Sequence, residues 1–191
     1  MAWFRFAYAP LILSAVSASV VEAETCPPPP DHSQSVQGLI EQVQAADNEG
    51  DARVISNQMW EFWADAPNEQ AQAILDRGMQ KRAAFDLAGA LQEFDILVDY
   101  CPEYAEGYNQ RAFVNYLRQD FRTAVVDLDR ALQLSPDHIA ALSGKALSLY
   151  ALGQLDAARD ALGRALEMNP WLPERGLAAP GGPLAPKGTD L

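Results

Sequence analysis

The chain has 191 residues, a formal net charge of −12 and 49% hydrophobic residues, which suits one globular domain with its own core. The excess of carboxylates argues against nucleic acid and anionic lipid as partners, because both are bound through Lys and Arg side chains. We therefore expect no nucleic acid partner and no charge-driven binding to membranes.

The first 23 residues have the composition of a secretory signal peptide. One positive side chain, Arg5, precedes an apolar stretch, and Val21 and Ala23 stand at the two positions that a signal peptidase reads. We expect cleavage after Ala23, with cleavage after Ala18 as the alternative. An uncleaved membrane anchor is disfavoured, because the stretch is short and Pro10 interrupts it. The sequence thus predicts a periplasmic or secreted protein that is not inserted in the membrane after cleavage.

Two cysteines bear on the attachment of the N-terminal arm. Cys26 lies in a Pro-rich arm, residues 24–34, and is followed by four prolines, whereas Cys101 directly precedes Pro102. In an oxidising compartment the two could form a disulfide that fastens the arm to the rest of the chain. Two unpaired thiols are the alternative.

Prolines recur at a spacing of 34 residues, at Pro102, Pro136 and Pro170. A period of that length indicates structural repeats. Six further columns keep the register in three copies: Gly78, Ala112 and Ala146; Ala90, Ala124 and Ala158; Phe94, Leu128 and Leu162; Leu97, Ala131 and Ala165; Leu87, Phe121 and Leu155; Ile74, Tyr108 and Leu142. We therefore expect three copies of one structural unit.

Each unit has the pattern of two helices. Apolar positions such as Leu128, Ala131 and Leu132 fall at helical spacing. In the second unit we expect helices from about Glu103 to Tyr116 and from Phe121 to Leu134. Small residues let the two helices approach closely. Each proline is expected in a first helical turn, where its missing N–H is not needed, with the residue before it as the cap.

These columns resemble the tetratricopeptide repeat family, in which a Gly/Ala column, an Ala column, a Phe/Leu column and a terminal Pro recur. The resemblance implies an all-α fold, an α-solenoid of stacked helix-turn-helix hairpins. We assign its repeats to residues 67–102, 103–136 and 137–170. The segments YCPEYAEGYNQRAF and NPWLPER are also similar to a group of small exported repeat proteins of Gram-negative bacteria.

Two further segments flank the repeats. Residues 35–66 have the pattern of a helical hairpin, and the repeat register places Ser56 in the Ala column and Trp60 in the Phe column. We interpret this hairpin as a degenerate repeat or a helical N-terminal cap of the solenoid. Residues 171–191 are rich in Gly and Pro. We expect Trp171 and Leu172 to pack over the end of the last unit, followed by a mostly disordered tail that leaves the last helix partly exposed.

The sequence contains no recognisable set of catalytic residues. Its two histidines, His32 and His138, are too few for a His-based metal site or a catalytic triad, and no phosphate loop or dinucleotide fingerprint occurs. We predict no catalysis, no cofactor and no metal. His138 stands at the start of an expected helix, where a capping or surface role is favoured.

One basic residue recurs in each unit, as Arg77, Arg111 and Lys145. A ladder of these side chains would either bind acidic residues of a partner or form ion pairs between repeats. We favour ion pairs, with the following acidic residues as candidates: Glu93, Asp95, Asp127 and Asp129.

The resemblance implies that the first helices of the units line a concave face. By register, we expect partner contact from Met79, Arg82, Asn109, Phe113, Tyr116, Leu147 and Tyr150. One subfamily uses Lys and Asn to clamp the terminal carboxylate of a peptide. Its clamp positions hold other residues in this chain, namely Leu75, Met79, Gln110, Ala140 and Gly144, so we do not expect that ligand class.

Taken together, the sequence predicts an exported scaffold or adaptor that binds a protein or peptide partner in the cell envelope without catalysis. The alternative is a self-associating structural protein, a homo-oligomer formed through its uncovered last repeat. The sequence does not specify the partner or the process that it serves.

Overall fold

The computed structural model describes residue 1 and residues 25–186, so the predicted signal peptide beyond residue 1 lies outside the described residues. The described part of the chain is helical and contains no strand, which confirms the all-α fold class. The helices in chain order are α1 Ser33–Gln44, α2 Glu49–Trp63, α3 Glu69–Ala83, α4 Leu87–Tyr100, α5 Ala105–Leu117, α6 Phe121–Leu134, α7 Ile139–Ala151, α8 Leu155–Met168 and α9 Arg175–Ala178.

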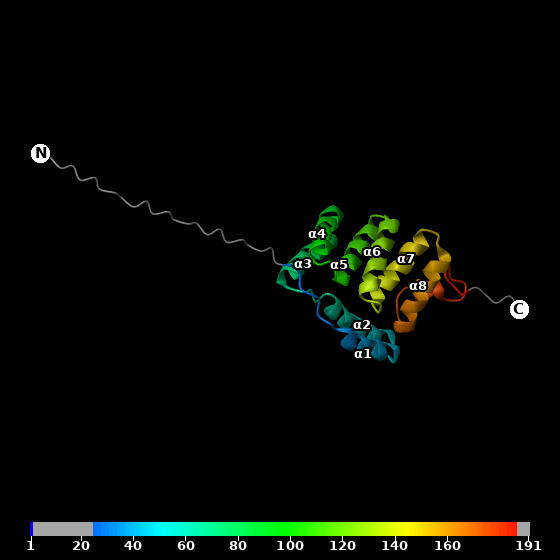
Figure 1. Ribbon diagram of the computed structural model, residues 1–191. Coiled ribbons are helices and arrows are strands. Elements are labelled where there is room, and N and C mark those ends of the chain that lie inside the picture. The colour runs from blue at the N-terminus through cyan, green and yellow to red at the C-terminus, as the bar shows by residue number, and fades with distance from the viewer. Residues whose placement is uncertain (2–24, 187–191) are drawn as a thin grey trace.

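Helices α3 to α8 form three antiparallel hairpins that stand side by side in a row (Figure 1). Each helix of the row contacts the helix before it and the helix after it. The large column, Phe94, Leu128 and Leu162, is buried between helices. The predicted solenoid of stacked helical hairpins is therefore confirmed, and its core is built from the repeated columns.

The turn inside each hairpin is the same in all three units. Phe85, Gln119 and Gly153 have φ angles of 62°, 63° and 74°, in the left-handed region that ends many helices. The N–H groups of Asp86 and Asp120 donate to carbonyl oxygens five residues earlier, at 2.9 Å in each case. Both carboxylates then cap the N-terminus of the next helix. A non-glycine residue is held at positive φ in two units, so the turn is fixed by its hydrogen bonds.

The turn between units differs from the prediction. Helix α7 begins at Ile139 and its N-cap is His138, so Pro136 precedes the first helical turn. Ser135 is the C-cap of α6, with φ −137° and ψ 88°. The residue before a proline is driven towards extended backbone, so Ser135 ends one helix and cannot cap the next.

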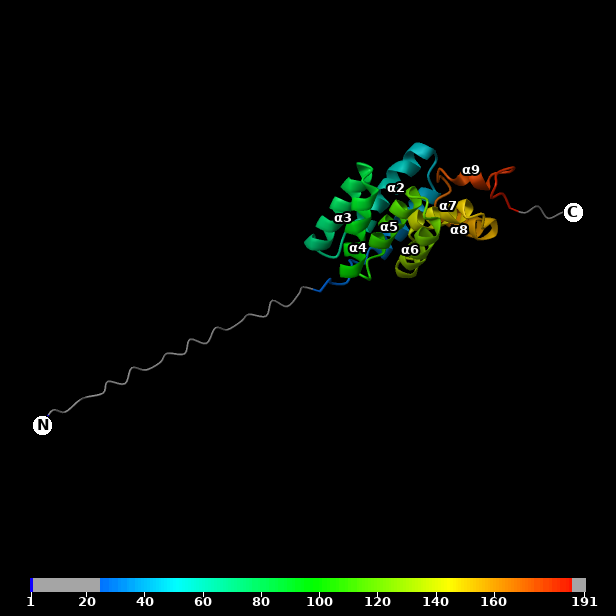
Figure 2. The same ribbon diagram turned by 90° about the horizontal axis from the view of Figure 1, so that it is seen from above.

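The α1–α2 hairpin does not occupy the predicted position of an N-terminal cap. It lies across the row of repeats and reaches its C-terminal end, where α1 contacts α8 (Figures 1 and 2). One apolar cluster joins the hairpin to α7: Val36, Leu39, Ile40, Val43, Ala52, Met59 and Ile139. Trp60, which the register places in the buried Phe column, is 36% exposed. The indole at that position is therefore not the interior residue that the repeat register would require.

Polar contacts between segments more than 100 residues apart fasten the hairpin at this place. They are Gln44 Nε2 to the carbonyl oxygen of Glu167 at 2.7 Å, Asn169 Nδ2 to Ser56 Oγ at 3.0 Å, and Arg175 Nη2 to Glu49 Oε2 at 2.8 Å. The N-terminal hairpin is thus bound to the last repeat and to the segment that follows it.

The C-terminal segment, residues 171–186, is folded, which corrects the predicted disordered tail. Leu184 is fully buried against α8, next to Leu177 of α9. Arg159 Nε donates to the carbonyl oxygen of Ala185 at 2.8 Å. Glycine here serves a turn, with Gly181 at φ 81°. The segment packs against part of α8, and Leu155 at the start of that helix stays 41% exposed.

The two cysteines form a disulfide between Cys26 and Cys101, whose Cα atoms are 5.2 Å apart. Cys101 is the buried C-cap of α4, and Cys26 belongs to the Pro-rich arm. The bond therefore ties the arm to the first repeat.

Candidate functional site: an inner groove and a buried polar network

The first helices of the repeats line a cavity of about 320 Å³, which we call the inner groove. Its lining residues are Trp60, Arg82, Asn109, Gln110, Ala112, Phe113, Tyr116, Leu128, Ala140, Ser143, Gly144, Leu147, Ser148, Leu172, Pro173 and Glu174. Most of these side chains are apolar or small, and Arg82 and Glu174 are its charged residues. Such a surface suits the side chains of a partner segment.

Helix α5 carries the aromatic part of the groove. Phe113 is 45% exposed, a large value for an aromatic side chain. The ring of Tyr116 lies edge-on to Phe121, with centroids 5.4 Å apart. From α3, the guanidinium of Arg82 lies 4.9 Å above the Phe113 ring. Both aromatic side chains are therefore held in position by neighbouring groups within the repeats.

Arg82 is half withdrawn from solvent, and this burial lowers the pKa of its guanidinium, with the nearby charge of Glu106 acting in the opposite direction. Its Nη1 atom donates to the side-chain oxygen of Gln110. The arginine is thus fixed by an amide below it and an aromatic ring beside it.

The structure brings together most of the residues predicted to contact a partner. Arg82, Asn109, Phe113, Tyr116 and Leu147 all line the inner groove. The other two do not. Met79 packs against the apolar cluster of α3 and α4, and Tyr150 is 38% exposed outside the groove.

Four groove residues lie outside the repeats, and the predicted set of partner contacts does not include them. Trp60 comes from α2, and Leu172, Pro173 and Glu174 come from the C-terminal segment. Each belongs to a flanking segment that packs over the row of repeats. The WLPE run after the last repeat proline was the available signal, since its large apolar residues are unusual for a disordered tail.

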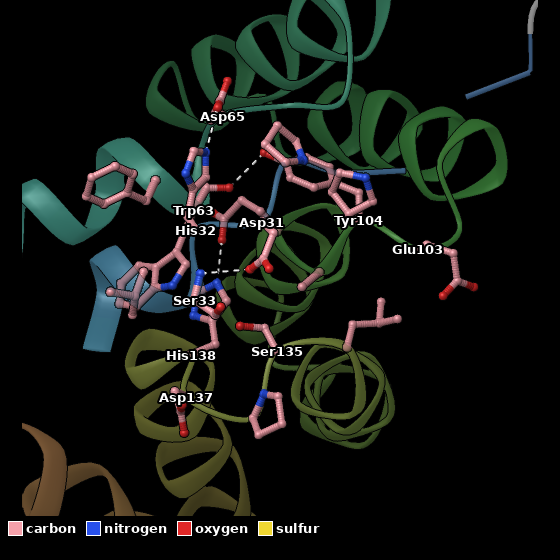
Figure 3. A pocket seen from close by; sticks show the side chains of 18 residues that line it. Asp31, His32, Ser33, Trp63, Asp65, Glu103, Tyr104, Ser135, Asp137 and His138 are labelled. Atoms are coloured by element: carbon pink, nitrogen blue, oxygen red, sulfur yellow. Dashed lines mark hydrogen bonds and ion pairs between the residues drawn. The ribbon is translucent and has the colours of Figure 1, made fainter. Parts of the chain in front are cut away.

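A second cavity, of about 220 Å³, lies between the Pro-rich arm, the α1–α2 hairpin and the turns that open α5 and α7 (Figure 3). We call it the polar cavity. Asp31, His32, Asp65, Glu103 and Asp137 contribute to its lining. His32 Nε2 lies 2.7 Å from Asp65 Oδ2, and Asp31 Oδ1 accepts from the Ser33 N–H at 3.0 Å. Asp65 and Asp31 are thus engaged by His32 and Ser33, and Glu103 pairs with Arg130 of α6 at 2.9 Å.

His138 closes the inner end of the polar cavity and is fully buried. Its Nδ1 accepts from the backbone N–H of Ala141 at 3.3 Å, so its Nε2 carries the proton and donates to Glu106 Oε2 at 2.8 Å. The ring stacks on Trp63, with centroids 4.3 Å apart. The predicted capping role is confirmed, whereas the predicted surface position is wrong, because the α1–α2 hairpin covers this histidine.

Glu106 connects the two cavities. This buried carboxylate accepts hydrogen bonds from Asn109, Gln110 and His138, and Gln110 accepts from Arg82. A continuous polar network thus runs from the inner groove through α5 to the polar cavity. Three donors on one carboxylate satisfy the requirement that a buried charge be paired.

The basic column forms four ion pairs. Arg77 with Glu93 at 3.0 Å and Arg111 with Asp127 at 2.7 Å each join the two helices of one hairpin. Arg111 with Asp95 at 3.0 Å and Lys145 with Asp129 at 2.6 Å join neighbouring units, as predicted. These cations are therefore engaged within the solenoid.

The described residues contain no group of three or more His, Cys, Asp or Glu side chains placed to hold a metal ion. Of the helices in this part of the chain, none is both long and apolar enough to span a membrane.

Comparison with known proteins agrees with this architecture. Residues 116–171 match the tetratricopeptide repeat family. Tetratricopeptide repeat protein 36 homolog of Nematostella vectensis is 43% identical over 65 residues, which are 34% of this chain and 36% of that protein. A TPR repeat-containing protein of Rhizobium etli is 26% identical over 140 residues, 72% of this chain and 67% of that protein.

Solved tetratricopeptide repeat domains share the fold. The first such domain of Spaghetti (RPAP3), bound to the HSP90 peptide SRMEEVD, superposes with a TM-score of 0.53 at 22% identity. The superposition covers 54% of this chain and 82% of that domain. The fold of the repeats is thus that of a tetratricopeptide repeat solenoid, and the α1–α2 hairpin and C-terminal segment pack onto it.

Proposed function

We propose that the chain is an exported tetratricopeptide repeat scaffold that binds a segment of another protein in its inner groove, without catalysis. The observation that carries this proposal is the aromatic and aliphatic surface of exposed Phe113 and partly exposed Tyr116 and Leu147, in a groove large enough for side chains of a partner. The peptide complex of the Spaghetti domain supports it, because a domain of the same fold binds a peptide.

The partner class differs from that peptide. The carboxylate-clamp positions of this chain hold Leu75, Met79, Gln110, Ala140 and Gly144, which offer no cation to a terminal carboxylate. We infer that the bound segment is internal to the partner chain and does not end in the groove.

Export is part of the proposal. The signal-like residues 1–23 favour it, and a disulfide between Cys26 and Cys101 suits an oxidising compartment. We expect the mature protein in the periplasm or the medium, beginning at Glu24. Mass spectrometry of the N-terminal peptide from fractionated cells tests this expectation, and an intact N-terminus in the cytosol would contradict it.

Site-specific photocrosslinking in cells tests the binding function. A photoreactive phenylalanine analogue replaces Phe113 in one variant and Val126 in another, since Val126 is 67% exposed on α6 outside the groove. We expect a discrete protein adduct from position 113 that is absent from position 126. A second change, Leu147→Asp, should remove the adduct without altering the helical circular dichroism. Adducts that are equal at both positions, or that persist with Leu147→Asp, would contradict groove binding.

A further inference from the structure

Two polar atoms of the inner groove have no hydrogen-bond partner, Glu174 Oε2 and Ser148 Oγ. Ser148 is fully buried on α7, and Glu174 Oε2 is shielded from solvent although its residue is partly exposed. A shielded carboxylate oxygen without a donor is destabilising, because its hydration is lost and not replaced. These two atoms favour a ligand that supplies hydrogen-bond donors, and the charge of the carboxylate favours a cationic one.

The groove itself does not neutralise this carboxylate. Arg82 is its other charged lining residue, and that guanidinium is directed to Gln110 and the Phe113 ring. Within the described part of the chain, no ion pair joins Glu174 to a cation. The negative charge at this edge therefore has no cationic partner among the described residues.

Apolar surface surrounds the two polar atoms. Leu147 directly precedes Ser148 on α7, and Leu172 and Pro173 directly precede Glu174 in the C-terminal segment. All five line the groove together with Trp60. An aliphatic or aromatic side chain of a partner can pack on this surface, while the stem of a neighbouring Lys or Arg lies along it. The site thus combines an apolar surface with one acidic edge.

On the basis of the proposed function, we propose that the bound segment carries an apolar or aromatic side chain beside a Lys or Arg. Glu174 and Ser148 receive the cationic group, and Glu174 determines this preference. The net charge of −12 supports the assignment, since it attracts basic segments and repels acidic ones. The preference is opposite to the acidic end of SRMEEVD, the peptide of the Spaghetti domain.

Selection from a phage-displayed library of random peptides on the disulfide-bonded mature protein tests the inference. We expect enrichment of an apolar or aromatic residue with Lys or Arg at a fixed offset. Glu174→Gln should abolish the cationic preference and keep the apolar one. The matched control Glu61→Gln removes an equal charge from the exposed residue beside Trp60, outside the groove lining, and should keep both. A selected peptide should bind Glu174→Gln about tenfold more weakly than wild type.

The outcomes separate this inference from the proposed function. Selected peptides that share an apolar residue but no cation overturn the inference and leave groove binding intact. Peptides that share an apolar and an acidic residue do the same, because Arg82 would then be the recognising group. Cationic enrichment that Glu61→Gln removes as fully as Glu174→Gln overturns it too, because general charge would then explain the preference. If no peptide is enriched, or if Phe113→Asp leaves the enrichment unchanged, both the inference and the proposed function are contradicted.

Discussion

The three repeats, α3 to α8, and the two flanking segments, α1–α2 and residues 171–186, are held by contacts of different range. Each helix of the repeats packs on its neighbour in sequence. The α1–α2 hairpin is instead held by contacts across 113 to 126 residues. Gln44 with Glu167 and Asn169 with Ser56 join it to the last repeat, and Arg175 with Glu49 joins the two flanking segments. The repeats thus depend on local contacts, whereas the flanking segments depend on the repeats to bring them together.

This difference matters for function because both regions contribute to the inner groove. The repeats supply its floor, with Phe113 and Leu147, and the flanking segments supply Trp60 and Glu174. A solenoid of repeats alone would present an open face. The flanking segments narrow that face and add its acidic edge, so changes that release them should alter binding while the repeats stay folded.

The largest expected effect comes from the disulfide of the N-terminal arm. Reduction should lower the free energy of unfolding by about 4 kcal/mol, because the bond closes a loop between residues 75 positions apart. Urea denaturation with and without dithiothreitol measures the loss. Cys26→Ala should match the reduced wild type and should not respond to the reductant. A reductant effect of equal size in Cys26→Ala would show that the disulfide is not its cause.

The second-largest loss of stability is expected where the α1–α2 hairpin packs on the repeats. His138→Ala should lower the free energy of unfolding by about 3 kcal/mol, since it removes the partner of the buried Glu106, the cap of α7 and the stack on Trp63. His32→Ala is the matched control, because it breaks a partly exposed pair with Asp65 and should cost less than about 1 kcal/mol. Equal losses in the two variants would contradict the buried junction.

The repeats could be predicted from the sequence, whereas the positions of the flanking segments could not. The period of 34 residues identified the columns of Ala124 and Leu128 because the repeat core depends on nearest neighbours, which leave a regular trace. The packing of α1 on α8 leaves no such trace, so the hairpin was misplaced. Within the groove, register found Phe113 on α5. It could not find Glu174, whose position depends on a turn that follows the last repeat.

A substitution inside one repeat should have a smaller, strictly local effect. A Cβ on Gly78 would clash with the Phe94 ring, whereas the other two units combine Ala with Leu in these columns. Gly78→Ala should therefore cost about 2 kcal/mol. Adding Phe94→Leu should recover part of that loss, so that the double variant costs less than the sum of the single ones.

Gly144→Ala provides the control for this crowding, because its Cβ would meet Leu128 at 3.4 Å, an ordinary contact. We expect no loss, or a gain of up to about 1 kcal/mol from helix propensity. Thermal or urea unfolding measures all four variants. Additive costs for Gly78→Ala and Phe94→Leu would show that the Gly–Phe combination is not a packing requirement.

The smallest effect distinguishes the ion pairs of the two regions. The hydrogen bond from Lys81 holds the pKa of Glu93 below its ordinary value of 4.5, with burial opposing and Arg77 adding to it. Because the folded-state pKa is lowered, the stability from Glu93 is fully present above pH 4.5 and is lost as the pH falls through the folded-state value.

Glu93→Gln should thus be less stable than wild type at neutral pH, and the difference should vanish in acid. Glu49→Gln, in the exposed pair with Arg175, should change the unfolding free energy by less than about 0.5 kcal/mol at neutral pH. Urea midpoints across the acid range measure both variants. If the loss of unfolding free energy in Glu93→Gln stays constant with pH, this carboxylate stabilises the repeats by packing and not by its charge.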